Sequence, residues 1–212
     1  SFQLFLRGNG EADTLIGNSA NNFLLDGNGT DTLTAGRGGD VYVLTENGAN
    51  YARDTVRVGL GHSPIGGVGI SDGIISSFAN AGSGFDTFSG TVANHDVLAL
   101  QSKVIAGNVS HDNGSDVGPI AQHSIASGIV TFEDAGGSAI AIGAASNLSS
   151  AIGYLAANIT VPGTTVAFRA DSDNNGSIDS LYVWQDSGTL SLAGGFVVTD
   201  MALRIGYDST NI

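Results

Sequence analysis

Apolar residues recur at every ninth position near the amino terminus of the chain. Leu15, Leu24, Leu33 and Tyr42 lie nine residues apart, and each stands two residues after an aspartate or an asparagine. The residues between these positions are rich in glycine and asparagine. Glycine allows the positive φ angles that tight turns need, so the pattern predicts a tandem repeat in which each turn is followed by a short strand that begins at the apolar residue.

The repeat runs from Gly8 to Val43 in four consecutive copies, GNGEADTLI, GNSANNFLL, DGNGTDTLT and AGRGGDVYV. If each copy forms one turn and one strand, two copies complete a coil, and turns on the same edge lie 18 residues apart. This stacking pairs Asp13 with Asp31 and Asn22 with Asp40. Calcium takes about six to eight oxygen ligands, which carboxylates and glycine carbonyls of stacked turns can supply. We therefore expect calcium to cross-link consecutive coils.

These copies resemble the RTX nonapeptide repeat, G-G-x-G-x-D-x-U-x, a family whose parallel β-roll binds calcium in its turns. The third and fourth copies match best. The alternative is a linker rich in glycine and asparagine, but such a linker would lack the fixed apolar position. Because Asn22 is neutral, we expect the Asn22/Asp40 pair to bind calcium more weakly than Asp13/Asp31. The resemblance implies metal-binding turns at Gly8, Gly10, Asp13, Asn22, Gly27, Gly29, Asp31, Gly36, Gly38 and Asp40.

A second acidic motif, DSDNNGSID, spans Asp171 to Asp179. Its oxygen-bearing side chains and its glycine resemble the first nine positions of an EF-hand calcium loop, but Tyr182 stands where that loop has its bidentate glutamate. The flanking sequences TTVAFRA and SLYVWQ read as strands. The alternative is an acidic hairpin turn without metal. We expect a calcium loop between two strands, with ligands Asp171, Asp173, Asn175, the carbonyl of Ser177, and Asp179.

The composition favours a turn-rich, mainly β protein. Glycine contributes 32 of the 212 residues, hydrophobic residues make up 42% and charged residues 13%. This chain is too apolar for a disordered tail and too lightly charged for a helical bundle. Counting along the sequence gives 17 Asp and 3 Glu. Asp is the shorter carboxylate, which caps turns and ligates calcium from tight loops.

Charge and residue usage exclude several functions. A net charge of −13 repels nucleic-acid phosphates, and the absence of cysteine excludes disulfides, thiolate metal sites and cysteine nucleophiles. No apolar run is long enough for a membrane-spanning helix. There is no HExxH or GxSxG motif, so the sequence gives no sign of an enzyme. The histidines, at positions 62, 95, 111 and 123, lack metal-site spacing and are interpreted as surface or turn residues; the alternative is a metal site assembled only in three dimensions.

Beyond the repeat, the sequence predicts more strands and a single helix. Asp54 followed by Val56 repeats the Asp-x-apolar step, which we interpret as one further coil with an insertion. The stretch 101–128 has no clear pattern, although HDNGSD at 111–116 could form another calcium turn. The only helix is expected near 147–157, capped by Ser146 or Asn147. Strands are expected at 53–60, 74–78, 85–88, 96–100, 180–185, 189–192, 196–198 and 203–207.

The sequence thus predicts an all-β protein in which a short parallel β-roll (1–60) continues into a larger β module (61–212) with one short helix. The order of repeats, helix, acidic loop and terminal strands resembles the carboxy-terminal region of bacterial surface-layer proteins and RTX adhesins exported by type I secretion. The resemblance implies a non-catalytic, calcium-binding assembly module, secreted or at the cell surface. The alternatives are a calcium-dependent adhesin ligand-binding domain, or the RTX appendage of a secreted hydrolase or epimerase. The partners expected are calcium ions and either further copies of the chain, through self-association, or a cell-surface glycan.

Overall fold

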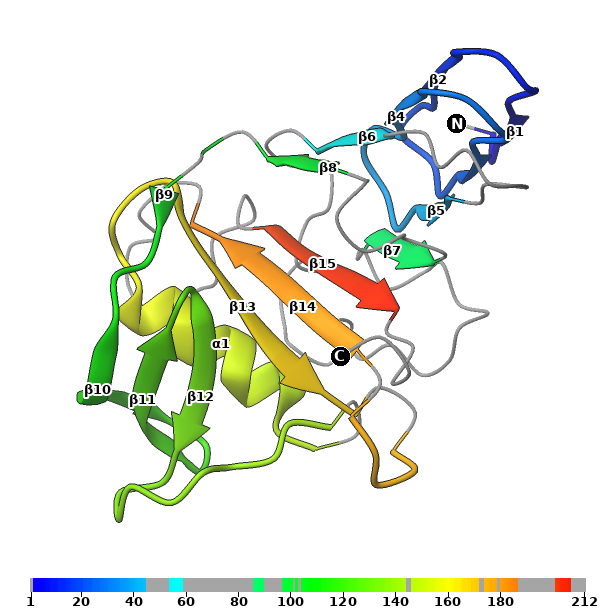
Figure 1. The fold of residues 1–212 in the computed structure, drawn as a ribbon. Helices are drawn as coiled ribbons and strands as arrows, with labels where there is room; N and C mark the ends of the chain where they lie inside the picture. The colour runs from blue at the N-terminus through cyan, green and yellow to red at the C-terminus, as the bar shows by residue number, and fades with distance from the viewer. Residues whose placement is uncertain are drawn as a thin grey trace.

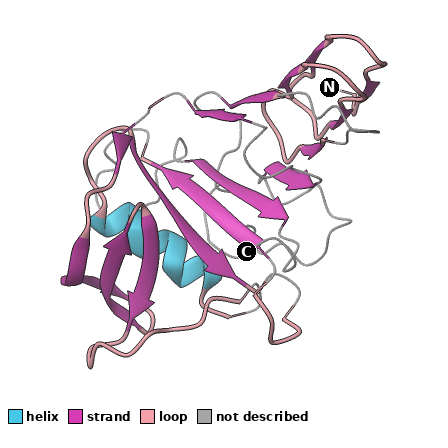
Figure 2. Ribbon diagram, in the orientation of Figure 1, coloured by secondary structure: helices cyan, strands magenta, loops and turns pink. Residues whose placement is uncertain are grey.

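The computed structural model describes residues 2–44, 54–58, 86–89, 97–100, 102, 104–143, 146–171, 174–178, 180–186 and 201–206. Within these residues the chain is mainly β, with one helix, α1 (Leu148–Asn158) (Figure 2). The predicted strands at 74–78, 189–192 and 196–198 lie outside the described residues, as do His62 and His95.

Each nine-residue copy contributes one short strand, and successive strands alternate between two parallel ladders. One ladder has the order β1-β3-β5-β7 and the other β2-β4-β6-β8. Leu6 pairs with Leu24 and Leu15 with Leu33, a step of 18 residues that confirms two copies per coil. The strands are β1 (Phe5–Arg7), β2 (Thr14–Ile16), β3 (Phe23–Leu25), β4 (Thr32–Thr34), β5 (Val41–Val43), β6 (Thr55–Val58), β7 (Asp86–Ser89) and β8 (Val97–Leu100).

The recurring apolar residue is the centre of its strand, one residue later than the strand start that the pattern predicts. Alternate residues of a strand point to opposite faces, so the central side chain of a three-residue strand turns inward while its neighbours turn outward. Leu24, Leu33 and Tyr42 are completely buried in this way. Val56 joins the same core, and β6 pairs with β4 through Leu33 and Val56. The Asp-x-apolar step at Asp54 and Val56 therefore marks a strand of the same ladder, as the sequence predicts.

The remaining strands extend the first ladder into a sheet of eleven strands, in the order β1-β3-β5-β7-β15-β14-β13-β12-β11-β10, with β9 paired to β13. Figure 1 shows the short coil strands at one end, α1 with β10–β12 at the other, and β13–β15 between them. These strands are β9 (Val104–Ile105), β10 (Val109–Val117), β11 (Ile120–Ala126), β12 (Ile129–Glu133), β13 (Thr164–Ala170), β14 (Ser180–Gln185) and β15 (Met201–Gly206).

Helix α1 is the crossover between the parallel strands β12 and β13, a connection that needs a segment of this length. Its buried face includes Leu148, Ile152 and Leu155, which join a second core with Phe132, Trp184 and other residues of the sheet. The helix therefore packs against the sheet. The predicted side-chain cap is not formed, because Asn147 takes a left-handed conformation (φ 61°) and its amide donates to the carbonyl of Ala141 at 3.1 Å.

The stretch 101–128, which showed no clear pattern, contains β9, β10 and β11, and β10 and β11 form an antiparallel meander with β12. The segment 111–116, considered as a calcium turn, is instead part of β10. Most residues of β10 are exposed, and its pairing with β11 shifts register between Val109 and Asp112 and again between Asn113 and Val117. These irregularities remove the alternation by which a strand is recognised in sequence.

Candidate metal centre

The turns of the nine-residue copies stack on two edges of the coil. We call the turns 8–13 and 26–31, together with Asp54, the aspartate edge. We call the turns 17–22 and 35–40 the asparagine edge. Parallel pairing at 18-residue steps places each turn on the one two copies later. Equivalent backbone groups therefore recur along each edge with different side chains.

One hydrogen bond repeats along both edges. The sixth residue of a turn accepts, through Oδ1, the backbone N–H of the sixth residue of the preceding coil. On the aspartate edge, Asp31 accepts from Asp13 and Asp54 accepts from Asp31, each at 2.7 Å. On the asparagine edge, Asn22 accepts from Leu4 at 3.1 Å and Asp40 accepts from Asn22 at 2.6 Å. This bond needs only a short side chain with an acceptor oxygen, so it explains why both aspartate and asparagine occupy the position.

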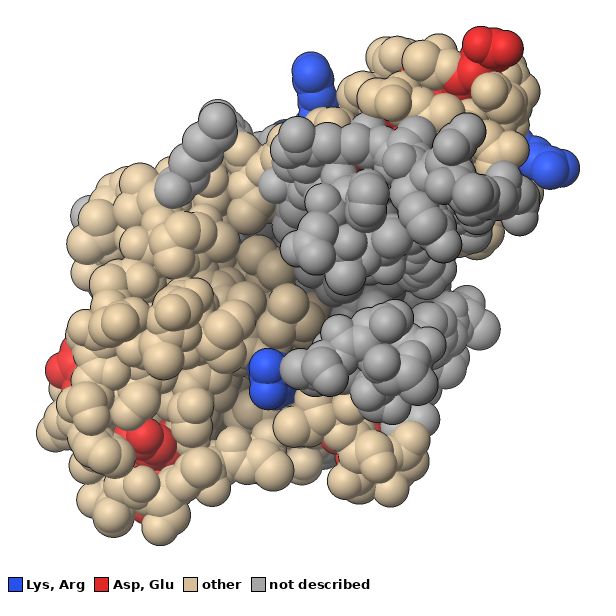
Figure 3. Space-filling view, in the orientation of Figure 1, with Lys and Arg blue, Asp and Glu red and all other residues tan. Residues whose placement is uncertain are grey.

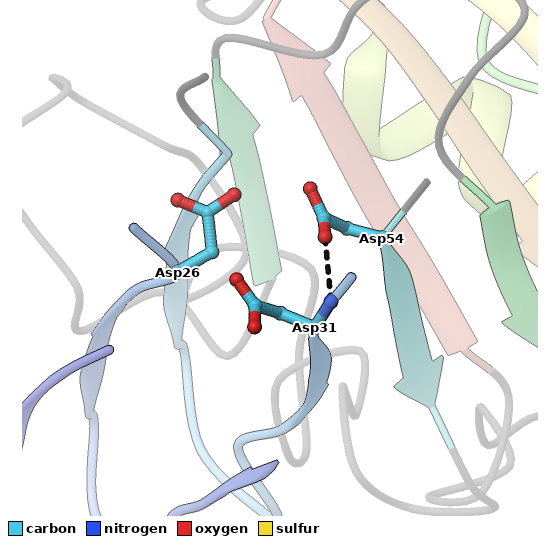
Figure 4. A group of neighbouring side chains, drawn as sticks. All are labelled: Asp26, Asp31 and Asp54. Atoms are coloured by element: carbon cyan, nitrogen blue, oxygen red, sulfur yellow. Dashed lines mark hydrogen bonds between the residues drawn. The ribbon is translucent and has the colours of Figure 1, made fainter. Parts of the chain in front are cut away.

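Three carboxylates meet on the aspartate edge. Asp26, Asp31 and Asp54 each offer an oxygen, and these oxygens lie within 4.8 Å of one another (Figure 4). Each of the three residues is at most 1% exposed. Asp31 and Asp54 immediately precede the neighbouring strands β4 and β6, and Asp26 comes from the turn that precedes β4. We refer to these residues as the acidic cluster.

Like charges at this separation and burial strongly disfavour the fully ionised state. Each neighbouring carboxylate raises the free energy of ionising the next, and removal from water adds a desolvation cost. A divalent cation among the oxygens reverses both effects, because its charge attracts all three groups and its ligand bonds replace water. The acidic cluster therefore has the donor set of a hard-cation site.

Backbone oxygens approach the glycines of the same edge closely. A Cβ at Gly27 would overlap the carbonyl oxygen of Asn9, and a Cβ at Gly29 would lie 2.6 Å from the carbonyl oxygen of Glu11. Both glycines have positive φ, 99° and 116°. Gly36 and Gly38 repeat this arrangement on the asparagine edge, with φ of 101° and 128°. Positive φ is confirmed for these four glycines, and it allows the turns to stack with carbonyl oxygens between them.

The first copy departs from the others. Asp13 is partly exposed, and its Oδ2 accepts the backbone N–H of Asn9 at 2.7 Å within the same turn. Gly8 and Gly10 precede it, and no atom lies within 4 Å of a Cβ built at Gly10. The structure thus brings Asp31 of the predicted Asp13/Asp31 pair into the acidic cluster, and Asp13 is joined to it through the backbone hydrogen bond.

Two members of the acidic cluster were not among the ligands predicted from the sequence. Asp26 is the first residue of its copy, where the other copies have Gly8, Gly17 and Ala35. The signal was present, since this carboxylate is the only charged residue at that position. Asp54 was recognised as part of a further coil. However, it lies 23 residues after Asp31 instead of 18, so the sequence did not indicate that its carboxylate lies beside that of Asp31.

The second predicted calcium loop is described in part. It joins β13 to β14, which pair antiparallel, so the predicted pair of flanking strands is confirmed. Asp171 accepts the backbone N–H of Asn175 at 3.1 Å through Oδ1 and that of Gly176 at 2.7 Å through Oδ2. Asn175 Oδ1 in turn accepts the N–H of Ser177 at 2.8 Å. Asp173 and Asp179 lie outside the described residues.

A separate group of polar residues lies on the meander, around the buried Glu133. Glu133 accepts the hydroxyl of Ser124 at 2.8 Å through Oε1, and its Oε2 lies 2.8 Å from Nδ1 of His111. The carboxylate therefore lies between the serine hydroxyl and the imidazole, while Ser124 Oγ accepts the backbone N–H of His111 at 3.0 Å. A nucleophilic serine needs the reverse order, with the imidazole next to the hydroxyl.

The expectation of surface histidines is wrong for His123, which is 3% exposed. Its Nδ1 lies 3.1 Å from the hydroxyl of the buried Tyr154. Burial lowers the pKa of His123, although Asp112 and Glu133 act in the opposite direction. Burial also raises the pKa of the Tyr154 hydroxyl, and Asp112 adds to this effect. The pair is therefore neutral near pH 7 and belongs to the core under α1.

The face of the molecule in Figure 3 carries acidic atoms only as small, separate groups among the uncharged residues that the structure describes. Much of the acidic character near the amino terminus is inside the coil, where Asp26, Asp31, Asp40 and Asp54 are buried. In the part of the chain that the structure describes, no helix has the length and apolar character needed to cross a bilayer.

A comparison with protein-family models, with curated proteins and with solved structures finds no match.

Proposed function

We propose that the chain is a non-catalytic, calcium-binding structural module whose amino-terminal repeats form a calcium-binding β-roll. The observation that carries the proposal is the acidic cluster of Asp26, Asp31 and Asp54, three buried carboxylates whose oxygens lie within 4.8 Å on one edge of the coil. A cation held there joins the turn 26–31 to the coil of Asp54. Calcium then acts as a cross-link between coils.

The donor set favours calcium among the common cations. The acidic cluster offers only oxygen ligands, and the neighbouring turns supply backbone carbonyls. Zinc and copper prefer nitrogen or sulfur donors, while magnesium demands a near-ideal octahedron and keeps much of its water. Calcium accepts the irregular oxygen cage that stacked glycine turns provide. Asp171, Asn175 and Ser177 belong to a second calcium loop in this proposal, together with Asp173 and Asp179.

Calcium binding to this coil is coupled to folding. Without the ion, the carboxylates repel one another, and the short strands bury few side chains each. An ion that binds the folded coil and not the unfolded chain stabilises the fold by mass action. A module of this kind folds where calcium is plentiful, which supports a place outside the cell. The lack of cysteine agrees with this role, because calcium then replaces disulfides as the staple.

The RTX-like repeat pattern supports a narrower assignment within this proposal. It favours a secreted or cell-surface bacterial protein of the surface-layer or adhesin kind, exported by type I secretion and assembled on extracellular calcium. Its partners in this assignment are calcium ions and either further copies of the chain or a cell-surface glycan.

Calcium titration of the whole chain tests the proposal. Isothermal titration calorimetry of the wild type should show calcium binding that is accompanied by a gain of β signal in circular dichroism. The charge-neutralising variants Asp26→Asn and Asp31→Asn should each weaken this binding by at least about tenfold, since each removes one carboxylate charge. Asp116→Asn is the matched control, because it makes the same change on an exposed residue. Equal affinity in all four proteins would refute the acidic cluster as the calcium site.

A further inference from the structure

The two edges of the coil are built from equivalent turns but carry different charges. At the first turn position, the aspartate edge has Asp26 and the asparagine edge has Ala35. At the sixth position of the earlier turn, the aspartate edge has Asp13 and the asparagine edge has Asn22. The asparagine edge therefore lacks two carboxylates at positions where the other edge has them.

The side-chain amide of Asn22 occupies the centre of the asparagine edge, where it is surrounded by oxygen atoms. Its Nδ2 lies 2.6 Å from the carbonyl oxygen of Ala20 and 3.2 Å from that of Asn18, both in its own turn. It also lies 3.3 Å from the carbonyl oxygen of Ala35 and 3.1 Å from Oδ1 of Asp40, both in the next turn along the edge. Asn22 is 1% exposed.

The orientation of this amide follows from its neighbours. Oδ1 accepts the backbone N–H of Leu4 at 3.1 Å. If the amide were turned over, its NH2 group would face that N–H, and its oxygen would face three carbonyls and a carboxylate. Donors would then meet a donor and acceptors would meet acceptors, so only the observed orientation satisfies both ends.

We infer that the amide nitrogen of Asn22 takes the place of a cation on the asparagine edge, so that this edge is held together without metal. The four oxygens around Nδ2 are backbone carbonyls and a carboxylate from two stacked turns, the ligand types that calcium takes in such turns. The two N–H groups of the amide, shared among these oxygens, present a partial positive charge to them and carry no desolvation cost of an ion. This inference rests on the proposed calcium role and deepens it by assigning the ion of the coil to the aspartate edge alone.

The inference replaces the sequence-based expectation of a weaker calcium site at Asn22 and Asp40. A weak site would use Asn22 Oδ1 as a ligand, but that oxygen is engaged by Leu4 and the amide nitrogen faces inward. The same geometry predicts how to open the edge to metal. An aspartate at this position keeps the acceptor for Leu4, removes the internal donor and supplies a carboxylate next to Asp40.

The test is the number of calcium ions bound per chain, measured by equilibrium dialysis at saturating calcium. Asn22→Asp should bind one ion more than the wild type. Asn21→Asp is the matched control, since it adds the same charge one residue away and keeps the acceptor oxygen that Gly39 N–H uses at 2.9 Å. The control should bind the wild-type number. If wild type binds calcium and Asn22→Asp adds no ion, this inference is overturned while the proposed function stands.

Other outcomes bear on both proposals. If wild type binds no calcium, the proposed function fails, and the inference, which rests on it, fails with it. Should Asn22→Asp not fold by circular dichroism, Asn22→Ala decides the question. We expect Asn22→Ala to bind the wild-type number of ions and to melt roughly 2–8 °C lower in saturating calcium, because the carbonyl oxygens around Nδ2 lose the side-chain donor while Oδ1 of Asp40 keeps the backbone N–H of residue 22. Loss of one bound ion in Asn22→Ala would identify Asn22 as a ligand and overturn the inference.

Discussion

The backbone N–H of Asp31 donates a 2.7 Å hydrogen bond to Oδ1 of Asp54, 23 residues further along the chain. The equivalent bonds from Asp13 to Asp31 and from Asn22 to Asp40 span 18 residues. The connection between β5 and β6 thus holds five residues more than the repeat requires, since 23 minus 18 is five. The carboxylate of Asp54 therefore accepts the same backbone hydrogen bond as Asp31 and Asp40, although the nine-residue period ends before Asp54.

Two substitutions at Asp54 separate this hydrogen bond from metal binding. An asparagine side chain at this position would keep an acceptor for Asp31 N–H, as Asn22 does for Leu4, but would remove one charge from the acidic cluster. We expect Asp54→Asn to weaken calcium binding by at least about tenfold. Asp54→Ala should weaken it similarly and should also lower the free energy of unfolding in saturating calcium by about 1–3 kcal/mol more, because a buried N–H loses its partner.

Calorimetry and urea unfolding across a calcium series measure both effects, with Asp116→Asn as the surface control. Calcium affinity that falls no further in Asp54→Asn than in Asp116→Asn would exclude Asp54 from the cation site. Equal unfolding free energies for Asp54→Asn and Asp54→Ala would show that the hydrogen bond to Asp31 contributes nothing measurable.

The sequence predicted the coil because its signal is local and repeated. Each apolar residue at the ninth step marks one strand centre, and the glycines mark the turns. The pairing of parallel strands two copies apart follows from this nine-residue period. The acidic cluster follows less directly. Asp26 is unusual only by comparison with Gly8, Gly17 and Ala35, and its meeting with Asp54 depends on the fold of two different coils.

The meander of β10–β12 could not be read from the sequence for a different reason. Strand β10 contacts α1 and β11 but leaves most of its residues exposed, so no alternation of apolar and polar residues marks it. The burial of His123 likewise depends on Tyr154, 31 residues away on α1. Contacts over such distances are set by tertiary packing, which local patterns do not encode.

Two glycines of the aspartate edge differ in the space available to an added Cβ atom. This difference predicts unequal effects of alanine substitution on stability. Gly29→Ala places a methyl group 2.6 Å from the carbonyl oxygen of Glu11 at a φ of 116°. We expect a loss of about 1–3 kcal/mol from the backbone conformation alone. Gly10→Ala meets no atom within 4 Å and should change stability by less than about 0.5 kcal/mol. Chemical denaturation in saturating calcium compares the two, and equal losses would contradict the stacked turn geometry.

The buried His123 predicts a loss of stability in acid. Its pKa is lowered in the folded state by burial, so the unfolded chain binds the proton more readily. The contribution of His123 to the free energy of unfolding is fully present above the pKa of the unfolded state, about 6.5. It falls as the pH drops from there toward the pKa of the folded state. His123→Gln cannot take up this proton. The melting temperature of the variant should therefore fall less than that of the wild type between about pH 7.5 and about pH 5.5.

Differential scanning calorimetry at fixed saturating calcium checks this expectation. The difference between variant and wild type isolates His123 from the other histidines, which remain in both proteins. A parallel decline of the two melting temperatures over the same pH range would show that His123 does not carry the pH dependence.

The hydroxyl of Tyr154 joins α1 to the meander, and its removal should weaken that joint. The oxygen lies 3.1 Å from Nδ1 of His123 and 3.4 Å from the carbonyl oxygen of Ala121. Phenylalanine fills the same volume but leaves these buried groups without the hydroxyl, so Tyr154→Phe should lower the free energy of unfolding by about 1–3 kcal/mol. In a double-mutant cycle with His123→Gln, residues in contact should show a coupling of at least about 0.5 kcal/mol. Additive losses would mean that the hydroxyl stabilises the helix through the backbone carbonyls of Ala121 and Asp112 and not through His123.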